Sequence, residues 1–317
     1  MKYIISVFII ALFVFGVISA VSMQAEATPP VIRILPDGSI YPPDVPIKRY
    51  GNVYTFTENI YARIVVDRDD IVIDGAGYTL YGNYNGTRTD SWIIGQGPNQ
   101  INSESLAPWS IGIDLANKNR RNLTVRNLNI KNFHIGIYVW TANNIIVNCA
   151  VTNCIVGILL SGDSNKIIRN YIACNEMGIF FGVNKPENEP LNIVLSHNSF
   201  INNVVHFSGC SCKEYSPNEP IHTWDNGKEG NYWDDYNGID ANGDGIGDVP
   251  YIIDQQNQDR FPLMQGVATP PTPMTSTSSI SATAIIMTGV MVAALTLVSA
   301  ASYMRKIIGK KVVKWLS

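Results

Sequence analysis

The residues best suited to chemistry lie in the C-terminal third of the chain, in the stretch GNYWDDYNGIDANGDGIGDVPY, Gly230 to Tyr251. Oxygen-bearing side chains alternate there with other residues, as in loops that wrap a hard cation. The candidate ligands occupy positions 1, 3, 5, 7 and 9 of such a loop: Asp240, Asn242, Asp244, the backbone carbonyl of Ile246, and Asp248. Gly245 at position 6 permits the sharp turn. The spacing predicts a calcium site.

This loop departs from the EF-hand pattern. Position 12 is Tyr251 instead of a bidentate glutamate, and no helical segment flanks the loop. It is similar to the calcium loops of dockerin and thrombospondin type, and Asp254 or Asp235 could supply the missing carboxylate. The alternative is a solvated turn of acidic, amide and glycine residues that holds no ion. Both interpretations stay open, with calcium as the predicted cofactor.

Three aromatic residues precede the loop: Tyr232, Trp233 and Tyr236. Their rings could stack on sugar rings, which makes them candidates for a carbohydrate-binding surface. They could also cover the open end of a stacked fold, because an uncovered strand edge invites aggregation. We favour the covering role over the sugar-binding role.

The elements that position these residues are predicted by an internal repeat. Gly136, Gly157 and Gly178 are 21 residues apart, and each begins a short apolar strand followed by a polar turn. Asparagines recur five apart: Asn127/Asn132, Asn148/Asn153, Asn170/Asn175 and Asn198/Asn203. A period near 22 residues without a helical stretch predicts an all-β solenoid, a parallel β-helix in which stacked asparagines bond to one another. A leucine-rich repeat would need a helical segment in every repeat, and a β-sandwich would not keep a fixed period.

The repeat resembles that of the NosD-like family, grouped with carbohydrate-binding and sugar-hydrolase β-helices. The coil pattern is found in Gly136–Asn153 and Gly157–Asn175, and Asp70–Gly82 looks like an opening coil. Gly230–Met264 is similar to the segment that closes archaeal cell-surface members. The resemblance implies a right-handed β-helix of about seven coils.

The resemblance also raises copper as a second candidate cofactor, because NosD-like proteins are named for a role in copper-site maturation. Copper needs clustered histidine, methionine or cysteine ligands. Only the stretch from His206 to His222 gathers histidine with cysteine, at Cys210 and Cys212. These two cysteines could equally form a bridge or cap the coil stack, and we favour those roles.

A β-helix can also carry a polysaccharide hydrolase or lyase site, which requires paired carboxylates on one exposed face. The candidates are Asp67, Asp69, Asp70, Asp74, Asp114, Asp163 and Glu176. Most lie in turns, where carboxylates commonly bond to local N–H groups. We therefore assign no catalytic residue, and carbohydrate-active enzyme stays an alternative function.

The two ends of the chain carry targeting signals. An apolar run ending in AEA predicts a cleaved signal peptide, and the uncharged run Ile280–Met304 is long enough to span a membrane before a basic tail. The predicted organisation is signal peptide 1–27, β-helix 28–229, closing segment 230–267, Pro/Ser/Thr-rich stalk 268–283, transmembrane helix 284–304 and cytoplasmic tail 305–317.

The charge of the chain argues against nucleic acid as a partner, since the formal net charge is −3 and no basic stripe is present. We therefore predict a single-pass cell-membrane protein whose β-helix is extracellular. Its predicted role is non-enzymatic binding of glycans or of envelope proteins at the cell surface.

Overall fold

The structure is a computed structural model that describes residues 30–84, 111–116, 121–182, 192–209, 222–254, 256–266 and 268–273. All of its strands belong to one compact unit, Met1–Thr272. Over the described ranges, a search for a helix with the length and apolarity of a membrane span finds none. The predicted signal peptide, transmembrane helix and cytoplasmic tail lie outside these ranges.

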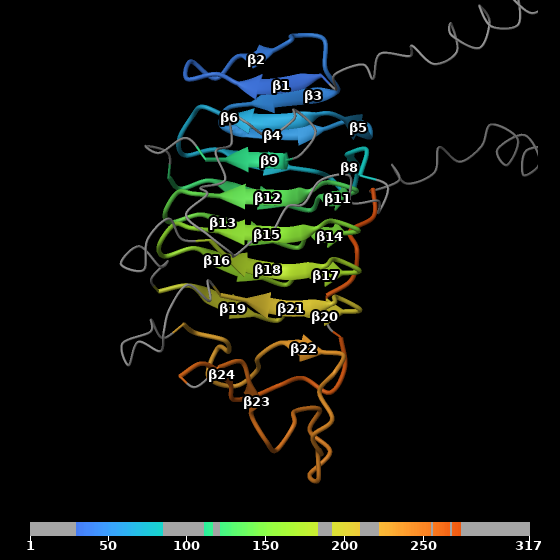
Figure 1. The fold of residues 1–317 in the computed structure, drawn as a ribbon. Coiled ribbons are helices and arrows are strands. Elements are labelled where there is room, and N and C mark those ends of the chain that lie inside the picture. Colours follow the sequence, from blue (N-terminus) through green and yellow to red (C-terminus); the bar gives the residue numbers. More distant parts are fainter. Residues whose placement is uncertain are drawn as a thin grey trace, which may run out of the picture. The chain divides into compact units, whose positions relative to one another are not determined.

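The strands form three long sheets and one hairpin (Figure 1). The first sheet consists, in order, of β2 Ile40–Tyr41, β1 Val31–Ile34, β6 Arg63–Val66, β9 Ile111–Leu115, β12 Ile135–Val139, β15 Val156–Leu160, β18 Met177–Phe181 and β21 Val205–Ser208. The second consists of β19 Val194–Ser196, β16 Lys166–Ile168, β13 Ile145–Val147, β10 Thr124–Arg126, β7 Val72–Asp74, β4 Val53–Phe56 and β3 Ile47–Tyr50. The third consists of β22 Tyr232–Trp233, β20 Ser199–Ile201, β17 Tyr171–Ala173, β14 Ala150–Thr152, β11 Asn129–Lys131, β8 Thr79–Tyr81 and β5 Ile60–Tyr61. The hairpin pairs β23 Tyr251–Ile252 with β24 Gln258–Asp259.

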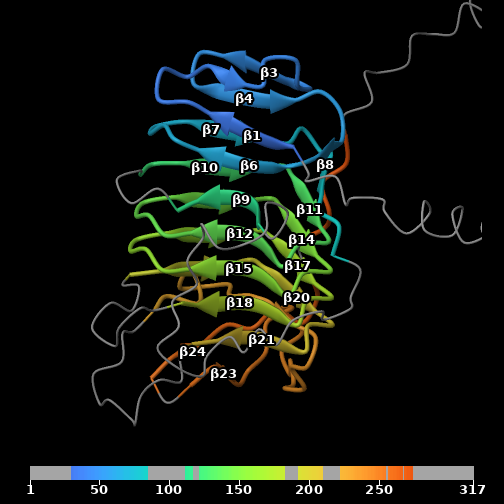
Figure 2. The ribbon, with the colours of Figure 1, turned by 45° about the horizontal axis from the view of Figure 1, so that its top comes forward.

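Successive coils each contribute one strand to each sheet, which is the parallel β-helix that the repeat predicts (Figures 1 and 2). Within the three sheets the pairing is parallel, except that β2 pairs antiparallel with β1 and β3 with β4 at the N-terminal end. Alternate residues of each strand point inward. Ile113, Ile137, Ile158 and Ile179 therefore stack in register as a fully buried row.

The repeating glycines are explained by close contact between coils. A Cβ on Gly136 would lie 2.6 Å from the carbonyl oxygen of Gly157, and one on Gly157 would lie 2.5 Å from that of Gly178. Any side chain there would collide with the next coil. Gly112 occupies the same place one coil earlier, where a Cβ would lie 2.6 Å from the carbonyl oxygen of Gly136.

The asparagine repeat needs a correction of one residue. Asn148 is in register with Arg169, and Cys149 is in register with Asn170, because Val147 pairs with Ile168. Asn148, like Asn127, has positive φ in an outer turn, where its Nδ2 donates to Asn127 Oδ1 at 2.7 Å. The repeated asparagines thus serve two positions. Those of the earlier coils hold left-handed turns, and those of the later coils form buried rows.

The chain returns along the third sheet after closing the stack. Ala268 N donates to Ser199 Oγ at 3.0 Å, and Asn129 Nδ2 donates to the carbonyl oxygen of Pro271 at 2.8 Å. Residues 263–266 and 268–272 therefore lie on the outside of the coils from β22 back to β11, as the orange-to-red segment of Figure 1 shows. We call these residues the strap. Its last part, residues 268–272, is the beginning of the predicted stalk.

Candidate metal centre

Two rows of stacked asparagines lead to the closing end of the solenoid. The first row consists of Asn170, Asn198 and Asn231 and ends at Asp259. The side-chain oxygen of each member accepts two N–H groups, backbone and side chain, from the member before it, at 2.9–3.1 Å. Every amide of the row donates in the same direction. The last amide therefore requires a partner that accepts hydrogen bonds and does not donate one. The Asp259 carboxylate supplies it, at 2.6 Å from Asn231 N.

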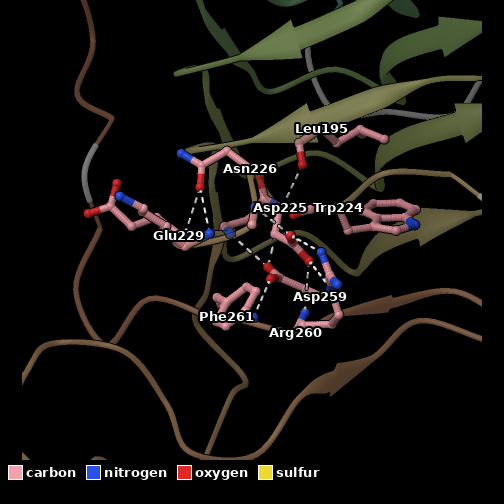
Figure 3. A network of polar contacts seen from close by, with 11 residues as sticks. Leu195, Trp224, Asp225, Asn226, Glu229, Asp259, Arg260 and Phe261 are labelled. Carbon is pink, nitrogen blue, oxygen red and sulfur yellow. Dashed lines mark hydrogen bonds and ion pairs between the residues drawn. The ribbon is translucent and has the colours of Figure 1, made fainter.

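Asp259 is fully buried where the row ends (Figure 3). Its carboxylate also accepts hydrogen bonds from Trp233 Nε1 at 3.0 Å and Phe261 N at 3.1 Å. Burial raises the pKa of Asp259 to about 6, although the hydrogen bonds from Trp233, Asn231 and Phe261 offset part of the rise. The side chain closes the row and is too enclosed to bind a ligand.

An ion pair between the exposed side chain of Arg260 and the buried carboxylate of Asp225 lies beside Asp259 in the same network (Figure 3). Arg260 donates to both oxygens of Asp225, from Nε at 2.9 Å and from a terminal nitrogen at 2.6 Å. Burial by itself would raise the pKa of Asp225. The hydrogen bonds from Arg260 and from Gly227 N outweigh it and hold that pKa below its usual value. The pair ties the chain after the last full coil to the segment that follows the hairpin.

The second row ends at a histidine. Asn175 donates from its backbone and side-chain nitrogens to Asn203 Oδ1, at 3.0 and 2.9 Å. Asn203 Nδ2 in turn lies 3.3 Å from His206 Nδ1. His206 precedes Phe207 on the last strand of the first sheet, β21, and its side chain is 7% exposed.

His206 meets two carboxylates that follow β22. Its Nε2 lies 2.8 Å from Asp234 Oδ1 and 3.4 Å from Asp235 Oδ1. One ligand atom from each of the three residues falls within 4.8 Å of the others. The other oxygens are held in place, since Asp234 Oδ2 accepts Asn202 N at 2.5 Å and Asp235 Oδ2 accepts the Tyr251 hydroxyl at 3.2 Å. Among the described residues this is the one group of histidine, cysteine and acidic side chains that could hold a metal ion.

Aromatic rings support this group from the core side. Trp233 is 1% exposed and is stacked between Phe200 and Tyr251, with both ring-centroid distances 4.3 Å. Its two faces are thus covered. Tyr232 and Tyr236 are half-buried, and the Tyr236 hydroxyl donates to the carbonyl oxygen of Val249 at 2.6 Å. The three rings lie at the closing end of the coil stack, which is the position expected of residues that cover its last strands.

The predicted calcium loop lies beyond these rings and its acidic side chains bond to its own backbone. Both oxygens of Asp240 accept N–H groups of the loop, from Gly243 at 2.7 Å and from Gly245 at 2.8 Å. Asp244 accepts Ile246 N at 2.9 Å, and Asp248 accepts Ala241 N at 2.9 Å. Asn242 Nδ2 donates to Asp244. The three carboxylates do not form a group as compact as that around His206. Calcium binding stays a prediction of the sequence.

Among the described residues, no cysteine and no second histidine joins the group around His206. Cys149 and Cys154 are buried, and burial raises the pKa of each thiol to about 12, so neither supplies a thiolate. His222 packs against Phe181, with ring centroids 4.7 Å apart, and burial lowers its pKa to about 4. Cys210 and Cys212 lie outside the described residues.

The carboxylates considered for glycoside hydrolysis have structural partners. Asp67 pairs with Arg33, Asp74 with Arg126 and Asp114 with Arg63, while Asp69 and Asp70 bond to Arg121 N and Asn122 Nδ2. Glu176 accepts the Tyr84 hydroxyl at 3.2 Å. These contacts are those expected of carboxylates that stabilise turns and neighbouring coils.

Sequence reasoning missed the group around His206. The sequence suggests Asp235 only as an extra calcium ligand and does not single out Asp234. His206 and Asp234 are 28 residues apart, which is longer than the 21-residue period, so the repeat does not align them. The available signal was the double aspartate directly after Trp233, an aromatic residue suited to the end of the stack.

A family model described as periplasmic copper-binding protein (NosD) matches residues 48–238, which include His206, Asp234 and Asp235. No curated protein and no solved structure matches the chain.

Proposed function

The chain belongs to the NosD family of periplasmic copper-binding proteins, and from this we propose that it is an exported β-helix protein that holds a divalent copper ion at its closing end. The proposed ligands are His206 Nε2 and one carboxylate oxygen each from Asp234 and Asp235. The observation that carries the proposal is the convergence of these three atoms within 4.8 Å.

The donor set fits Cu(II) better than Cu(I). Imidazole nitrogen suits divalent copper, nickel and zinc, whereas Cu(I) prefers thiolate and thioether sulfur. Bonds of about 2.0–2.2 Å place neighbouring ligand atoms roughly 2.8–3.5 Å apart. The separations of 2.8 and 3.4 Å from Nε2 to the two carboxylates fall in this range.

The surroundings support binding and transfer of an ion in preference to catalysis. His206 is fixed against Phe200 and Trp233, whereas Asp235 is 58% exposed and faces solvent. Three protein donors leave coordination positions open, through which an ion could enter and be passed on. Export agrees with the periplasmic setting of the family. The membrane span at 284–304 and glycan binding, for which an array screen of the full chain is the direct test, stay predictions of the sequence.

The test is copper(II) titration of the full-length protein and of two histidine variants. We expect His206→Gln to weaken Cu(II) binding at least about tenfold and to remove the imidazole nitrogen signature from the Cu(II) electron paramagnetic resonance spectrum. His197→Gln is the matched control, because His197 also pairs with one carboxylate, Glu229, at 2.8 Å. Equal Cu(II) affinity in the wild type and His206→Gln would overturn the proposal.

A further inference from the structure

We infer that Asn203, the last amide of the second row, fixes the tautomer of His206 and thereby restrains metal binding by this histidine. Asn203 supplies no ligand, so it is a positioning residue. The metal part of the inference rests on the proposed function. The tautomer part does not, because it can be measured without metal.

The orientation of the Asn203 amide is set by groups whose hydrogen-bonding roles cannot switch. The backbone N–H of Asn175 donates to Oδ1 at 3.0 Å, which identifies that atom as the oxygen. The backbone carbonyl of Ile172 accepts from Nδ2 at 2.8 Å, which identifies the nitrogen. If the amide were turned over, Asn203 Nδ2 would face the backbone N–H of Asn175, and Asn203 Oδ1 would face the carbonyl oxygen of Ile172. Neither hydrogen bond could then form.

The amide orientation in turn decides which nitrogen of His206 carries the proton. Asn203 Nδ2 has two hydrogens, and the one not used by Ile172 faces His206 Nδ1 at 3.3 Å. Nδ1 must therefore accept, and in the neutral ring the proton lies on Nε2. There it points to Asp234 Oδ1, 2.8 Å away.

Metal binding requires the opposite arrangement. An ion on Nε2 uses the lone pair of that atom, so the proton must move to Nδ1, where it would face the N–H of Asn203. Metal-bound histidines nearly always donate their second N–H to a carboxylate, a carbonyl or water. Packing by Phe200 and Trp233, with centroids 6.0 and 5.9 Å away, opposes rotation of the ring out of this contact. The coil stack thus imposes a free-energy cost on metal uptake.

The first experiment measures the tautomer in the metal-free, ¹⁵N-labelled full-length protein. Long-range ¹H–¹⁵N correlation at pH 7.5 should show His206 Nδ1 unprotonated and Nε2 protonated, with His206→Gln identifying the signals. A proton on Nδ1, in either the neutral ring or the cation, would overturn the inference.

The second experiment replaces the opposing donor. Asn203→Asp keeps an oxygen for Asn175 and offers Nδ1–H an acceptor, so we expect the proton to move to Nδ1 and the Cu(II) affinity to rise at least about tenfold. Asn202→Asp is the matched control, since it adds the same charge one residue away on an exposed side chain. Should Asn203→Asp fail to fold, Asn203→Ala also removes the donor and should raise the affinity.

The outcomes separate the inference from the proposed function. An Asn203→Asp affinity no higher than that of Asn202→Asp would overturn the restraint. An Nε2–H tautomer in a protein whose variants all fail to bind Cu(II) would overturn the proposed function and leave the tautomer assignment standing. If the wild type bound Cu(II) but carried the His206 proton on Nδ1, the tautomer assignment would be overturned and the proposed function would stand.

Discussion

At the scale of single residues, the closing end depends on two acceptors that end the asparagine rows. The Asp259 carboxylate lies at the end of one row, and His206 Nδ1 lies at the end of the other. Neither role is visible in the sequence, because it depends on which residue lies at the last coil. The asparagines themselves are visible, since their spacing follows the coil period. A chain of buried amides has to end in an acceptor, and an apolar residue there would leave an N–H group unsatisfied.

The raised pKa of Asp259 predicts a pH dependence of stability. Its folded pKa of about 6 lies above the usual value of 3.8 for an aspartate, so the folded state binds the proton more tightly. The stabilisation from this group is present below pH 3.8 and is lost as the pH rises through 6, by an amount on the order of 2–3 kcal/mol.

The measurement is urea unfolding of the wild type and Asp259→Asn between pH 4 and pH 7. We expect the wild type to gain unfolding free energy relative to the variant as the pH falls, because the asparagine does not titrate. The variant should also be less stable by about 1–3 kcal/mol. Its side-chain NH₂ group would face one of the N–H groups that donate to the Asp259 carboxylate, and that hydrogen bond would be lost. A free-energy difference that does not change with pH would contradict the prediction.

At the scale of elements, the repeating glycines should be the positions least tolerant of a side chain. In Gly157→Ala the new Cβ would lie 2.5 Å from the carbonyl oxygen of Gly178, and two parallel strands would have to separate. We expect a loss of roughly 1–3 kcal/mol in unfolding free energy, the usual cost of overpacking. Gly209→Ala is the control, because no atom of the described residues lies within 4 Å of a Cβ there. The two alanine variants would have equal melting temperatures if contact between coils were not the reason for the glycine.

The strand pattern and the glycine period could be predicted from the sequence, but the register of the asparagines could not. Asn148 and Asn170 look equivalent because each is followed, five residues on, by another asparagine. The ladder shows that Asn170 aligns with Cys149, so the two cysteines at 149 and 154 take inward positions of the buried rows. Asparagine suits both the left-handed turn and the buried row, and composition alone therefore does not distinguish the two positions.

At the scale of the whole molecule, contacts between distant parts of the chain decide what the sequence leaves open. The solenoid follows from a local repeat, which each coil satisfies with its neighbours. The group around His206 depends on how the chain returns after an insertion of arbitrary length. The strap depends on hydrogen-bonding partners along the third sheet that come from different coils, namely Asn129 and Ser199. A proline-rich composition predicts an extended chain and does not indicate whether that chain packs on a surface.

The strap should contribute to the stability of the whole stack, because it crosses the third sheet from β22 to β11. Ala268 is 7% exposed against this sheet, whereas its neighbour Thr269 is exposed. In Ala268→Lys the long charged side chain cannot remain in the contact, so the strap should detach and lose the hydrogen bond to Ser199. We expect about 1–3 kcal/mol less unfolding free energy and new protease cleavage within residues 263–272. Thr269→Lys carries the same charge on the outer side and should behave as the wild type in both measurements. If the two lysine variants were equally resistant to protease and equally stable, residues 268–272 would be a free stalk, as their composition predicts, and the solenoid would be stabilised by its coils alone.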